Sequence, residues 1–194
     1  MAKELEIEYK NMLTKEEYLT LLDYFNYSSE DAFSQVNHYF DTKDFQLKHN
    51  RTALRIRERD NYWECTLKKP APVGKFEITD PLNEQQAEAM LNLQSFDAPE
   101  VEAELQELGI AWRDLQSIGS LRTNRIEFEF LGGLLVLDHS TYLDQEDFEV
   151  EFEVTDAVEG KKQFKAFLKD QKIPTRKTLK KIARFMQAAR AANS

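Results

Sequence analysis

The chain has 194 residues, and 41% of them are hydrophobic, so it can bury a substantial core. With 6 Gly, 5 Pro and 1 Cys, the composition excludes collagen-like, low-complexity and disulfide-stapled proteins. The 26 Lys and Arg against 35 Asp and Glu give a formal net charge of −9, which disfavours a long nucleic-acid interface or attraction to anionic lipid. Any basic site must therefore be local, and we predict no nucleic-acid partner.

We also predict no membrane or export segment. The longest apolar run, 131–137, is interrupted by glycines and is too short to span a bilayer, and the first residues contain no apolar signal region. We therefore expect a cytoplasmic protein, a monomer or homodimer, in which Cys65 is reduced and belongs to the core. Because no stretch rich in Gly, Ser and Pro interrupts the chain, we predict one domain over residues 1–194.

The first predicted elements are a strand and a helix. Near the N-terminus Leu5, Ile7 and Tyr9 alternate with charged residues, as in a strand with one apolar face. A helix is predicted over residues 14–26, because Thr14 and Glu17 form a capping box ahead of apolar residues at helical spacing.

Three more alternating strands are predicted in the middle of the chain, over residues 54–59, 63–68 and 75–79. Two helices follow. One begins at Asn83, with Gln86 three residues later, and the other runs from Pro99 to Leu108 with Gly109 as its stop.

The last part of the chain repeats this pattern. Strands are predicted over 125–130 and 148–154, and a more buried strand over 135–138 that ends on Asp138. Two helices are predicted around residues 164–168 and 179–186. Many alternating strands with few amphipathic helices indicate an antiparallel sheet or barrel whose apolar face the helices cover.

The polar faces of these strands are almost entirely Glu, Arg and Lys. One interpretation is a face that simply meets water. However, like charges two residues apart repel one another unless counter-ions lie between them, and solvated faces usually include Thr, Ser and Gln as well. If the apolar faces point outward to helices, closing the sheet would place the charged faces around a polar tunnel.

Acidic and basic rows in one cavity predict a particular ligand. Guanidinium groups such as those of Arg55 and Arg57 bind phosphate oxygens in pairs, and lysines such as Lys10 act as compact charges. Carboxylate pairs such as Glu149 and Glu151 suit hard divalent cations. The combination indicates a site for a metal-bound phosphate chain, where the chemistry is phosphoryl transfer.

The same residues form a series of motifs that resembles the CYTH superfamily, also called triphosphate tunnel metalloenzymes. The series runs from Glu6-Ile-Glu8-Tyr-Lys10 (ExExK) through Asn37–Thr42, Leu54-Arg-Ile-Arg57, Trp63–Lys68, Leu137-Asp138, Tyr142-Leu143 and Phe148-Glu-Val-Glu151 to Lys181-Ile-Ala-Arg184. It covers nearly the whole chain, which is most similar to the stand-alone bacterial CYTH proteins.

This resemblance implies an α+β fold, with an eight-stranded antiparallel barrel around a tunnel and helices on the outside. It implies a substrate clamp of Lys10, Arg55, Arg57, Lys68, Arg125 and Lys181. It implies Mg²⁺ or Mn²⁺ bound by Glu6, Glu8, Glu149 and Glu151, with Glu77, Asp138 and Glu153 as further candidate ligands. Catalysis would depend on Glu6, Glu8, Lys10, Arg57, Glu149 and Glu151. Two choices stay open at this point. Either Lys180 or Lys181 is the lysine that enters the tunnel, and either Arg122 or Arg125 is the arginine that does so.

Three functions fit these residues. The preferred one is a metal-dependent triphosphatase that acts on inorganic triphosphate or a small organic triphosphate. A class IV adenylyl cyclase, which the superfamily includes, would also need an adenine pocket, and no such constellation is evident in the sequence. A polyphosphate-binding module without turnover would gain nothing from the carboxylates. P-loop, Rossmann and nucleophile-elbow motifs are absent from the sequence, and His38, His49 and His139 do not have metal-ligand spacing.

Overall fold

The computed structural model of the chain describes residues 3–192. The strands are β1 (Lys3–Leu13), β2 (Phe33–Thr42), β3 (Ala53–Arg59), β4 (Tyr62–Pro70), β5 (Lys75–Leu82), β6 (Leu115–Phe130), β7 (Gly133–Tyr142) and β8 (Gln145–Val154). The α-helices are α1 (Lys15–Tyr24), α2 (Gln46–His49), α3 (Glu84–Leu91), α4 (Pro99–Glu107), α5 (Ala157–Asp170) and α6 (Lys181–Ala192). Among the helices of residues 3–192, none combines the length and apolar character needed to cross a bilayer.

The eight strands form one closed barrel in the order β1-β5-β4-β3-β2-β6-β7-β8. The neighbours β1 and β8, β2 and β3, β3 and β4, β4 and β5, β6 and β7, and β7 and β8 pair in antiparallel registers. The predicted α+β fold with an eight-stranded antiparallel barrel is therefore confirmed.

The chain divides into two compact units. Unit 1 contains residues 3–5 and 35–121, and unit 2 contains residues 6–34 and 122–192. Three strands belong to both units, because the division falls after Leu5 in β1, after Ser34 in β2 and after Leu121 in β6. A single domain over residues 1–194 stays a prediction.

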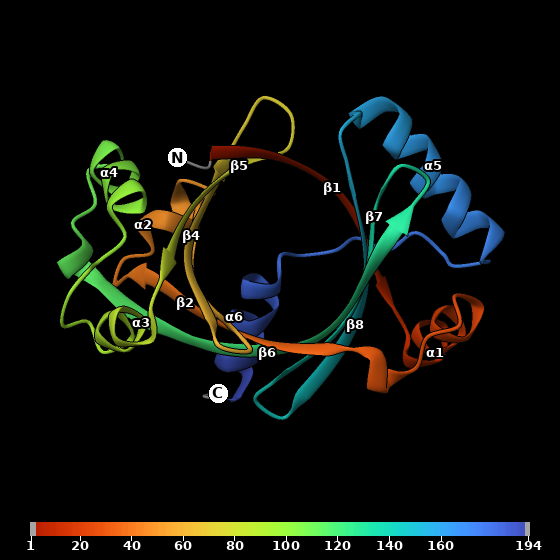
Figure 1. Cartoon of the computed structure of the whole chain (residues 1–194), viewed down its shortest axis with the longest axis horizontal. Helices are drawn as coiled ribbons and strands as arrows, with labels where there is room; N and C mark the ends of the chain where they lie inside the picture. The colour runs from red at the N-terminus through yellow and green to blue at the C-terminus, as the bar shows by residue number, and fades with distance from the viewer. Residues whose placement is uncertain (1–2, 193–194) are drawn as a thin grey trace. The chain divides into compact units, whose positions relative to one another are not determined.

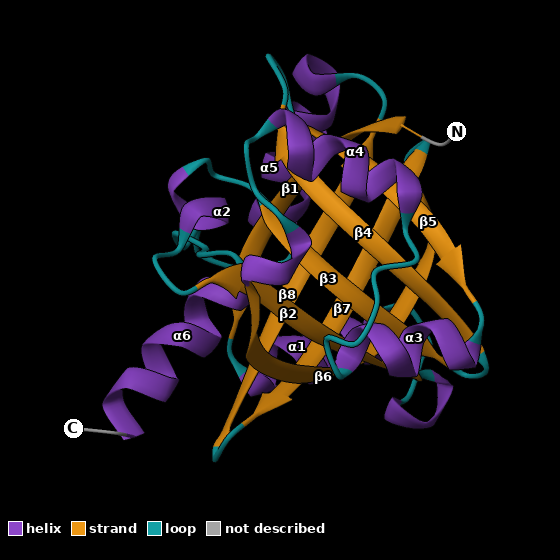
Figure 2. Cartoon of the chain, turned by 90° about the vertical axis from the view of Figure 1, so that its left-hand side faces the viewer, coloured by secondary structure: helices purple, strands orange, loops and turns teal. Residues whose placement is uncertain are grey.

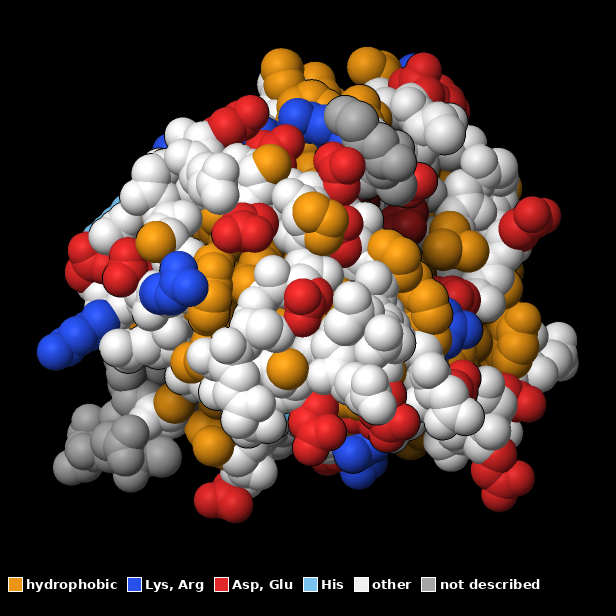
Figure 3. Space-filling view, turned by 60° about the vertical axis from the view of Figure 1, so that its left-hand side comes forward, with side chains coloured by type: hydrophobic (Ala, Val, Ile, Leu, Met, Phe, Trp, Pro, Cys, Tyr) orange, Lys and Arg blue, Asp and Glu red, His pale blue; other side chains and the backbone are white. Residues whose placement is uncertain are grey.

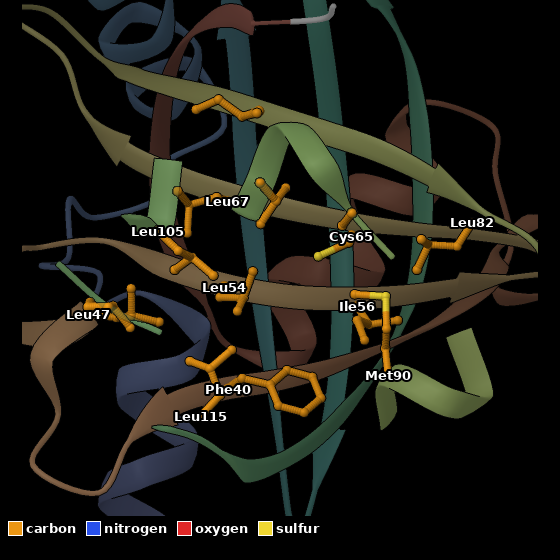
Figure 4. Close-up of a cluster of buried hydrophobic side chains, with 14 of the residues drawn as sticks. Phe40, Leu47, Leu54, Ile56, Cys65, Leu67, Leu82, Met90, Leu105 and Leu115 are labelled. Atoms are coloured by element: carbon orange, nitrogen blue, oxygen red, sulfur yellow. The ribbon is translucent and has the colours of Figure 1, made fainter. Parts of the chain in front are cut away.

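The core of unit 1 lies between β3 to β5 and the helices α3 and α4, which lie in front of these strands in Figure 2. Period-two alternation brings the apolar residues of the strands to one face, and Figure 4 shows them with side chains of the helices. The fully buried members include Leu54, Cys65, Leu67, Met90 and Leu105. The predicted capping box at Asn83 and Gln86 is present, and Pro99 begins α4 as expected. The charged side chains at the alternate strand positions therefore face away from these helices.

The core of unit 2 has the same construction. Figure 1 shows α1 and α5 outside β7 and β8, and the apolar residues Val150 and Phe152 of β8 are buried beneath them. α1 begins with the predicted capping box, in which Thr14 and Glu17 each accept a backbone hydrogen bond from the other. Here too the opposite face of the strands carries the charged residues, which makes it the inner face of the barrel.

Three element boundaries differ from the sequence-based prediction. β7 does not end on Asp138 but continues to Tyr142, because Ser140 and Thr141 still pair with β8. α6 begins at Lys181, so Leu179 lies in the preceding segment. β6 begins at Leu115, ten residues before the predicted start at 125, and the sequence indicates β2 only through the family motif Asn37–Thr42.

Candidate active site

Charged side chains of β1, β6, β7 and β8 lie together on the inner face of unit 2. In the sheet register Lys10 lies opposite Glu151, Arg125 opposite Asp138, and Asp138 opposite Glu149. Directly opposite residues point to the same side of a sheet. α6 adds two cations from its first turn. We name the whole set the acid–base cluster, and its members are Glu8, Lys10, Arg125, Asp138, Asp147, Glu149, Glu151, Lys181 and Arg184.

Glu151 is at the centre of the acid–base cluster. Its Oε1 lies 3.1 Å from Lys10 Nζ and 2.7 Å from Lys181 Nζ, and its Oε2 accepts a hydrogen bond from Arg125 Nη2 at 3.1 Å. Burial raises the pKa of Glu151, but the charges of Lys10, Lys181 and Arg125 outweigh this effect and hold that pKa well below its usual range. Glu151 is therefore ionised although it is 4% exposed.

Asp138 and Arg125 form a bidentate pair. Arg125 Nε donates to Asp138 Oδ1 at 2.8 Å, and Nη2 donates to Oδ2 at 2.7 Å. Lys181 Nζ lies 2.8 Å from the same Oδ2. Burial opposes ionisation of Asp138, yet these two cations outweigh it and lower the pKa of the carboxyl. The pair fixes Arg125 before any ligand arrives.

Glu149 is completely buried and differs from its neighbours in its hydrogen bonding. Its Oε2 accepts from Arg184 Nη2 at 2.6 Å, whereas its Oε1 has no hydrogen-bond partner among the described residues. The ammonium of Lys10 lies 3.5 Å from Oε1. Burial raises the pKa of Glu149, and the cations Lys181, Lys10 and Arg184 offset this only in part. This carboxylate therefore has an oxygen that can take a further positive partner.

Unit 1 contains a second group of charged residues, on the strand face that α3 and α4 do not cover. We name it the arginine cluster, and its members are Asn37, Arg55, Arg57, Glu64, Lys68 and Glu77. Arg57 Nε donates to Asn37 Oδ1 at 3.0 Å, and its Nη1 lies 3.4 Å from Glu64 Oε1. Lys68 forms an ion pair with Glu77.

Cations exceed carboxylates in the arginine cluster, which suits it to an anion. Arg55 Nε is buried and has no hydrogen-bond partner among the described residues. Burial raises the pKa of Glu77, but the charges of Lys68, Arg55 and Arg57 outweigh this effect and lower that pKa. Arg55, Arg57 and Lys68 are mostly buried, whereas the Lys and Arg side chains on the face seen in Figure 3 lie scattered among Asp and Glu.

The structure brings most of the predicted site residues into these two groups. Lys10, Arg125, Lys181, Asp138, Glu149, Glu151 and Glu8 meet in unit 2, and Arg55, Arg57, Lys68 and Glu77 meet in unit 1. Glu153 lies opposite Glu8 in the register, and its charge contributes to the raised pKa of Arg125. Glu6 is half-buried and lies two residues before Glu8, on the same face of β1.

The two open choices between neighbouring cations have a geometric answer. Lys181 contacts three carboxylates of the acid–base cluster, whereas Lys180 is exposed. Arg125 belongs to the cluster as well, whereas Arg122 is exposed and donates to Ser34 Oγ at 2.9 Å.

Sequence reasoning missed four residues that complete these groups. Arg184 binds both Glu149 and Asp147, and it lies three residues after Lys181, which is the spacing of one helix face. Asp147 continues the alternation of Glu149 and Glu151. Glu64 precedes Lys68 on the same strand face, and Asn37 begins the family motif Asn37–Thr42. Spacing alone could have indicated Arg184, Asp147 and Glu64.

The acid–base cluster has the donor chemistry for a hard divalent cation. Carboxylate oxygens are the ligands that Mg²⁺ and Mn²⁺ prefer. Among the described residues, no group of three or more His, Cys, Asp or Glu is arranged to hold a metal ion, and Lys10 and Lys181 form ion pairs with Glu151. The unpartnered Oε1 of Glu149 is nevertheless a buried oxygen that a cation would satisfy. The carboxylates of the acid–base cluster therefore have the ligand type that Mg²⁺ or Mn²⁺ requires.

Comparison with known proteins gives consistent results. A family model of the CYTH domain matches residues 4–186. YjbK of Bacillus subtilis (strain 168), provisionally named a triphosphatase, is 44% identical over 192 residues, 98% of each chain. A crystal structure from Bacillus halodurans, provisionally named an adenylate cyclase, is 41% identical with a TM-score of 0.92, and the match covers 95% of this chain and 99% of the other.

A more distant structure has the same fold. HpAC1 from Hippeastrum, provisionally named an adenylyl cyclase and described as having a dominant triphosphatase activity, matches with a TM-score of 0.76. It is 22% identical to this chain, and the match covers 96% of both chains. At this identity the likeness supports the fold alone.

Proposed function

Because the chain belongs to the CYTH family, we propose that it is a hydrolase of triphosphates that depends on a divalent metal ion. The name of YjbK agrees with this activity. The observation that carries the proposal is the acid–base cluster, in which buried carboxylates and cations occupy one face of the sheet. The substrate is inorganic triphosphate or a small organic triphosphate, and water is the second reactant.

The charge balance of the acid–base cluster favours a metal and a phosphate chain together. Its five carboxylates outnumber its four cations, so a triphosphate alone would approach net negative charge. Mg²⁺ or Mn²⁺ would supply the missing positive charge and would neutralise phosphate oxygens as negative charge shifts during the reaction. Glu6, Glu8, Glu149 and Glu151 would hold it, with Asp138, Glu153 and Glu77 as further candidate ligands.

The basic residues do the positioning in this reaction. Water attacks the terminal phosphorus, and the bond between that phosphorus and the bridging oxygen of the leaving diphosphate breaks. The residues that would bind phosphate oxygens are Lys10, Arg55, Arg57, Lys68, Arg125 and Lys181. Their existing ion pairs hold these groups near their working positions, so little reorganisation is needed when the substrate binds.

A phosphate-release assay on the purified chain tests the proposal. We expect release of phosphate from inorganic triphosphate or a small organic triphosphate in the presence of Mg²⁺ or Mn²⁺, and its loss with a chelator. Glu6→Gln and Arg57→Ala should each lower turnover by about 100-fold or more while the protein stays folded. Glu16→Gln and Arg122→Ala, at exposed positions, are the matched controls and should leave the rate unchanged. Wild-type rates in both site variants would refute the assignment.

A measurement of cyclic AMP in the same reactions addresses the cyclase. The structure from Bacillus halodurans, whose name points to that activity, is the observation that favours this second candidate. Cyclic AMP formed from ATP without phosphate release from triphosphate would establish the cyclase. Binding of triphosphate with neither product would indicate a binding module.

A further inference from the structure

The segment between α5 and α6 is attached to unit 2 by three residues, Asn11, Glu17 and Arg176, which we name the anchor. Asn11 is completely buried at the end of β1. Its Nδ2 donates to Pro174 O at 3.1 Å, and its Oδ1 accepts from Arg176 N at 2.6 Å. One side chain thus binds the segment on both sides of residue 175.

Arg176 makes the second attachment. Its Nη1 and Nη2 donate to the two carboxylate oxygens of Glu17 at 2.6 and 2.8 Å, and Nη1 also donates to Met12 O at 3.0 Å. Glu17 is held in turn by the capping box of α1, since its Oε2 accepts from Thr14 N. The hydrogen bonds from Arg176 lower the pKa of Glu17, so the pair is ionised at neutral pH. A bidentate pair of this kind has a defined geometry.

The anchor lies close along the chain to the cations that α6 contributes to the acid–base cluster. Five residues after Arg176 the chain reaches Lys181, whose ammonium contacts Asp138, Glu149 and Glu151. Arg184 Nη1 also donates to Leu179 O at 2.6 Å, which fixes the connection between the anchor and α6. Figure 2 shows α6 extending away from the strands towards the C-terminus. The position of its first turn therefore depends on what precedes it.

Electrostatics give the anchor a specific task. The N-terminus of a helix carries partial positive charge, so a lysine in the first turn of α6 is unfavourable unless carboxylates face it. If a divalent cation takes Glu149 and Glu151, Lys181 and Arg184 lose part of that compensation. α6 would then be repelled, and contacts outside the acid–base cluster must retain it.

We propose that Asn11, Glu17 and Arg176 are positioning residues that keep Lys181 and Arg184 at the acid–base cluster when its carboxylates bind metal and substrate. The catalytic part of this inference rests on the proposed function. The attachment of α6 does not depend on it, and it can be measured in protein without substrate.

Amide hydrogen exchange of residues 178–189 and steady-state kinetics on the full-length chain test the proposal. Glu17→Ala and Arg176→Ala are suitable because both side chains are partly exposed, so the protein should stay folded. We expect exchange of residues 178–189 to rise at least fivefold in each variant, and more with Mg²⁺ than without it, while the exchange of β8 stays unchanged. We expect kcat for triphosphate hydrolysis to fall about 10- to 100-fold.

Two further variants separate positioning from general stability. Thr14→Ala removes the other half of the capping box but keeps the pair of Glu17 with Arg176, so it should destabilise α1 without raising exchange in residues 178–189. The double variant Glu17→Arg with Arg176→Glu restores an ion pair in reverse and should recover at least part of kcat.

Each outcome has a defined meaning. Unchanged exchange of residues 178–189 in Arg176→Ala overturns the anchor whatever the activity. Raised exchange with wild-type kcat overturns its catalytic part. A wild-type protein that hydrolyses no triphosphate refutes the proposed function instead, and the exchange data then still decide whether the anchor holds α6.

Discussion

Arg125 binds two carboxylates through one guanidinium, and this is a task that lysine cannot perform. Arg125→Lys keeps the charge but loses the two parallel hydrogen bonds to Asp138. We expect the free energy of unfolding to fall by about 1.5–3 kcal/mol, since hydrogen bonds between charged groups in this setting are worth that much. Urea denaturation followed by circular dichroism measures the change.

The neighbouring arginine provides the control. Arg122→Lys alters an exposed side chain with a hydrogen bond to Ser34, and its effect should stay within about 0.5 kcal/mol. If the two variants unfold at the same urea concentration, the bidentate pair of Arg125 and Asp138 contributes nothing to the free energy of unfolding. The role given to this pair in the acid–base cluster would then be wrong.

Alternation of residue types was sufficient to predict which side chains share a face. Lys10, Arg125, Glu149 and Glu151 each alternate with apolar neighbours, which predicts that they lie on the charged face of their strands, and the register brings them together. Their roles as clamp residues and metal ligands follow only from the family resemblance. Arg184 was not chosen, although its spacing from Lys181 was visible. No local pattern says that a helix near the C-terminus will dock on a particular strand, because that docking depends on the path of the anchored segment.

The contact between α5 and β8 places opposing demands on Gly160. Alanine is favoured over glycine inside a helix by about 1 kcal/mol, yet a Cβ at position 160 would lie 2.5 Å from Val154 Cγ2 and 2.9 Å from Val154 Cβ. A β-branched side chain on a strand cannot move aside freely. We therefore expect Gly160→Ala to destabilise the protein by about 1–3 kcal/mol, as overpacked cores do.

Removal of the neighbouring methyl groups should reverse this effect. Val154→Ala with Gly160→Ala removes the two closest contacts, those to Cγ1 and Cγ2, so the double variant should be more stable than the sum of the two single changes predicts. Thermal unfolding of the four proteins completes the cycle. Strict additivity, or stabilisation by Gly160→Ala alone, would show that helix propensity outweighs close packing here.

The boundaries of helices with start or stop signals in the local sequence were predicted within a few residues. The boundaries of elements without such signals were not. α1 and α3 have capping boxes, and α4 has a proline at its start and a glycine after its end. The early part of β6, from Leu115 to Asn124, includes polar and small residues on both faces and lacks clean alternation. Its strand conformation depends on pairing with neighbours, which a local pattern does not record.

Closure of the barrel was the feature least accessible to pattern analysis. Period-two alternation says which face of a strand is buried but not which strand lies beside it. β1 lies between β5 and β8, two strands that are distant from it in sequence. The residue pattern therefore does not decide between an antiparallel sheet and a barrel. The number of strands, eight, is predicted only by the family resemblance.

Paired carboxylates should make the stability of the whole molecule depend on pH. The pKa of Glu17 is lowered by hydrogen bonds from Arg176, and that of Glu104 is lowered because Lys69 and Lys3 outweigh burial. A carboxyl whose pKa is lower in the folded state than in the unfolded state stabilises the fold fully above the unfolded value, near 4.5 for Glu. This stability is lost as the pH falls through the lowered folded value. Glu149, whose pKa is raised, acts in the opposite sense and offsets part of the loss.

We therefore expect the midpoint of thermal unfolding to be nearly constant from pH 7 to about 5 and to fall below about pH 4.5. Glu17→Gln and Glu104→Gln each remove a carboxyl whose pKa is lowered in the folded state. Each variant should therefore have a lower midpoint at pH 7, and its midpoint should fall less steeply towards pH 3. Circular dichroism melts at half-unit pH intervals would show both effects. A midpoint that rises on acidification would mean that the unfavourable burial of ionised Glu149 outweighs the favourable ion pairs of Glu17 and Glu104. The acid–base cluster would then lower the free energy of unfolding, and bound cations would be needed to offset this loss.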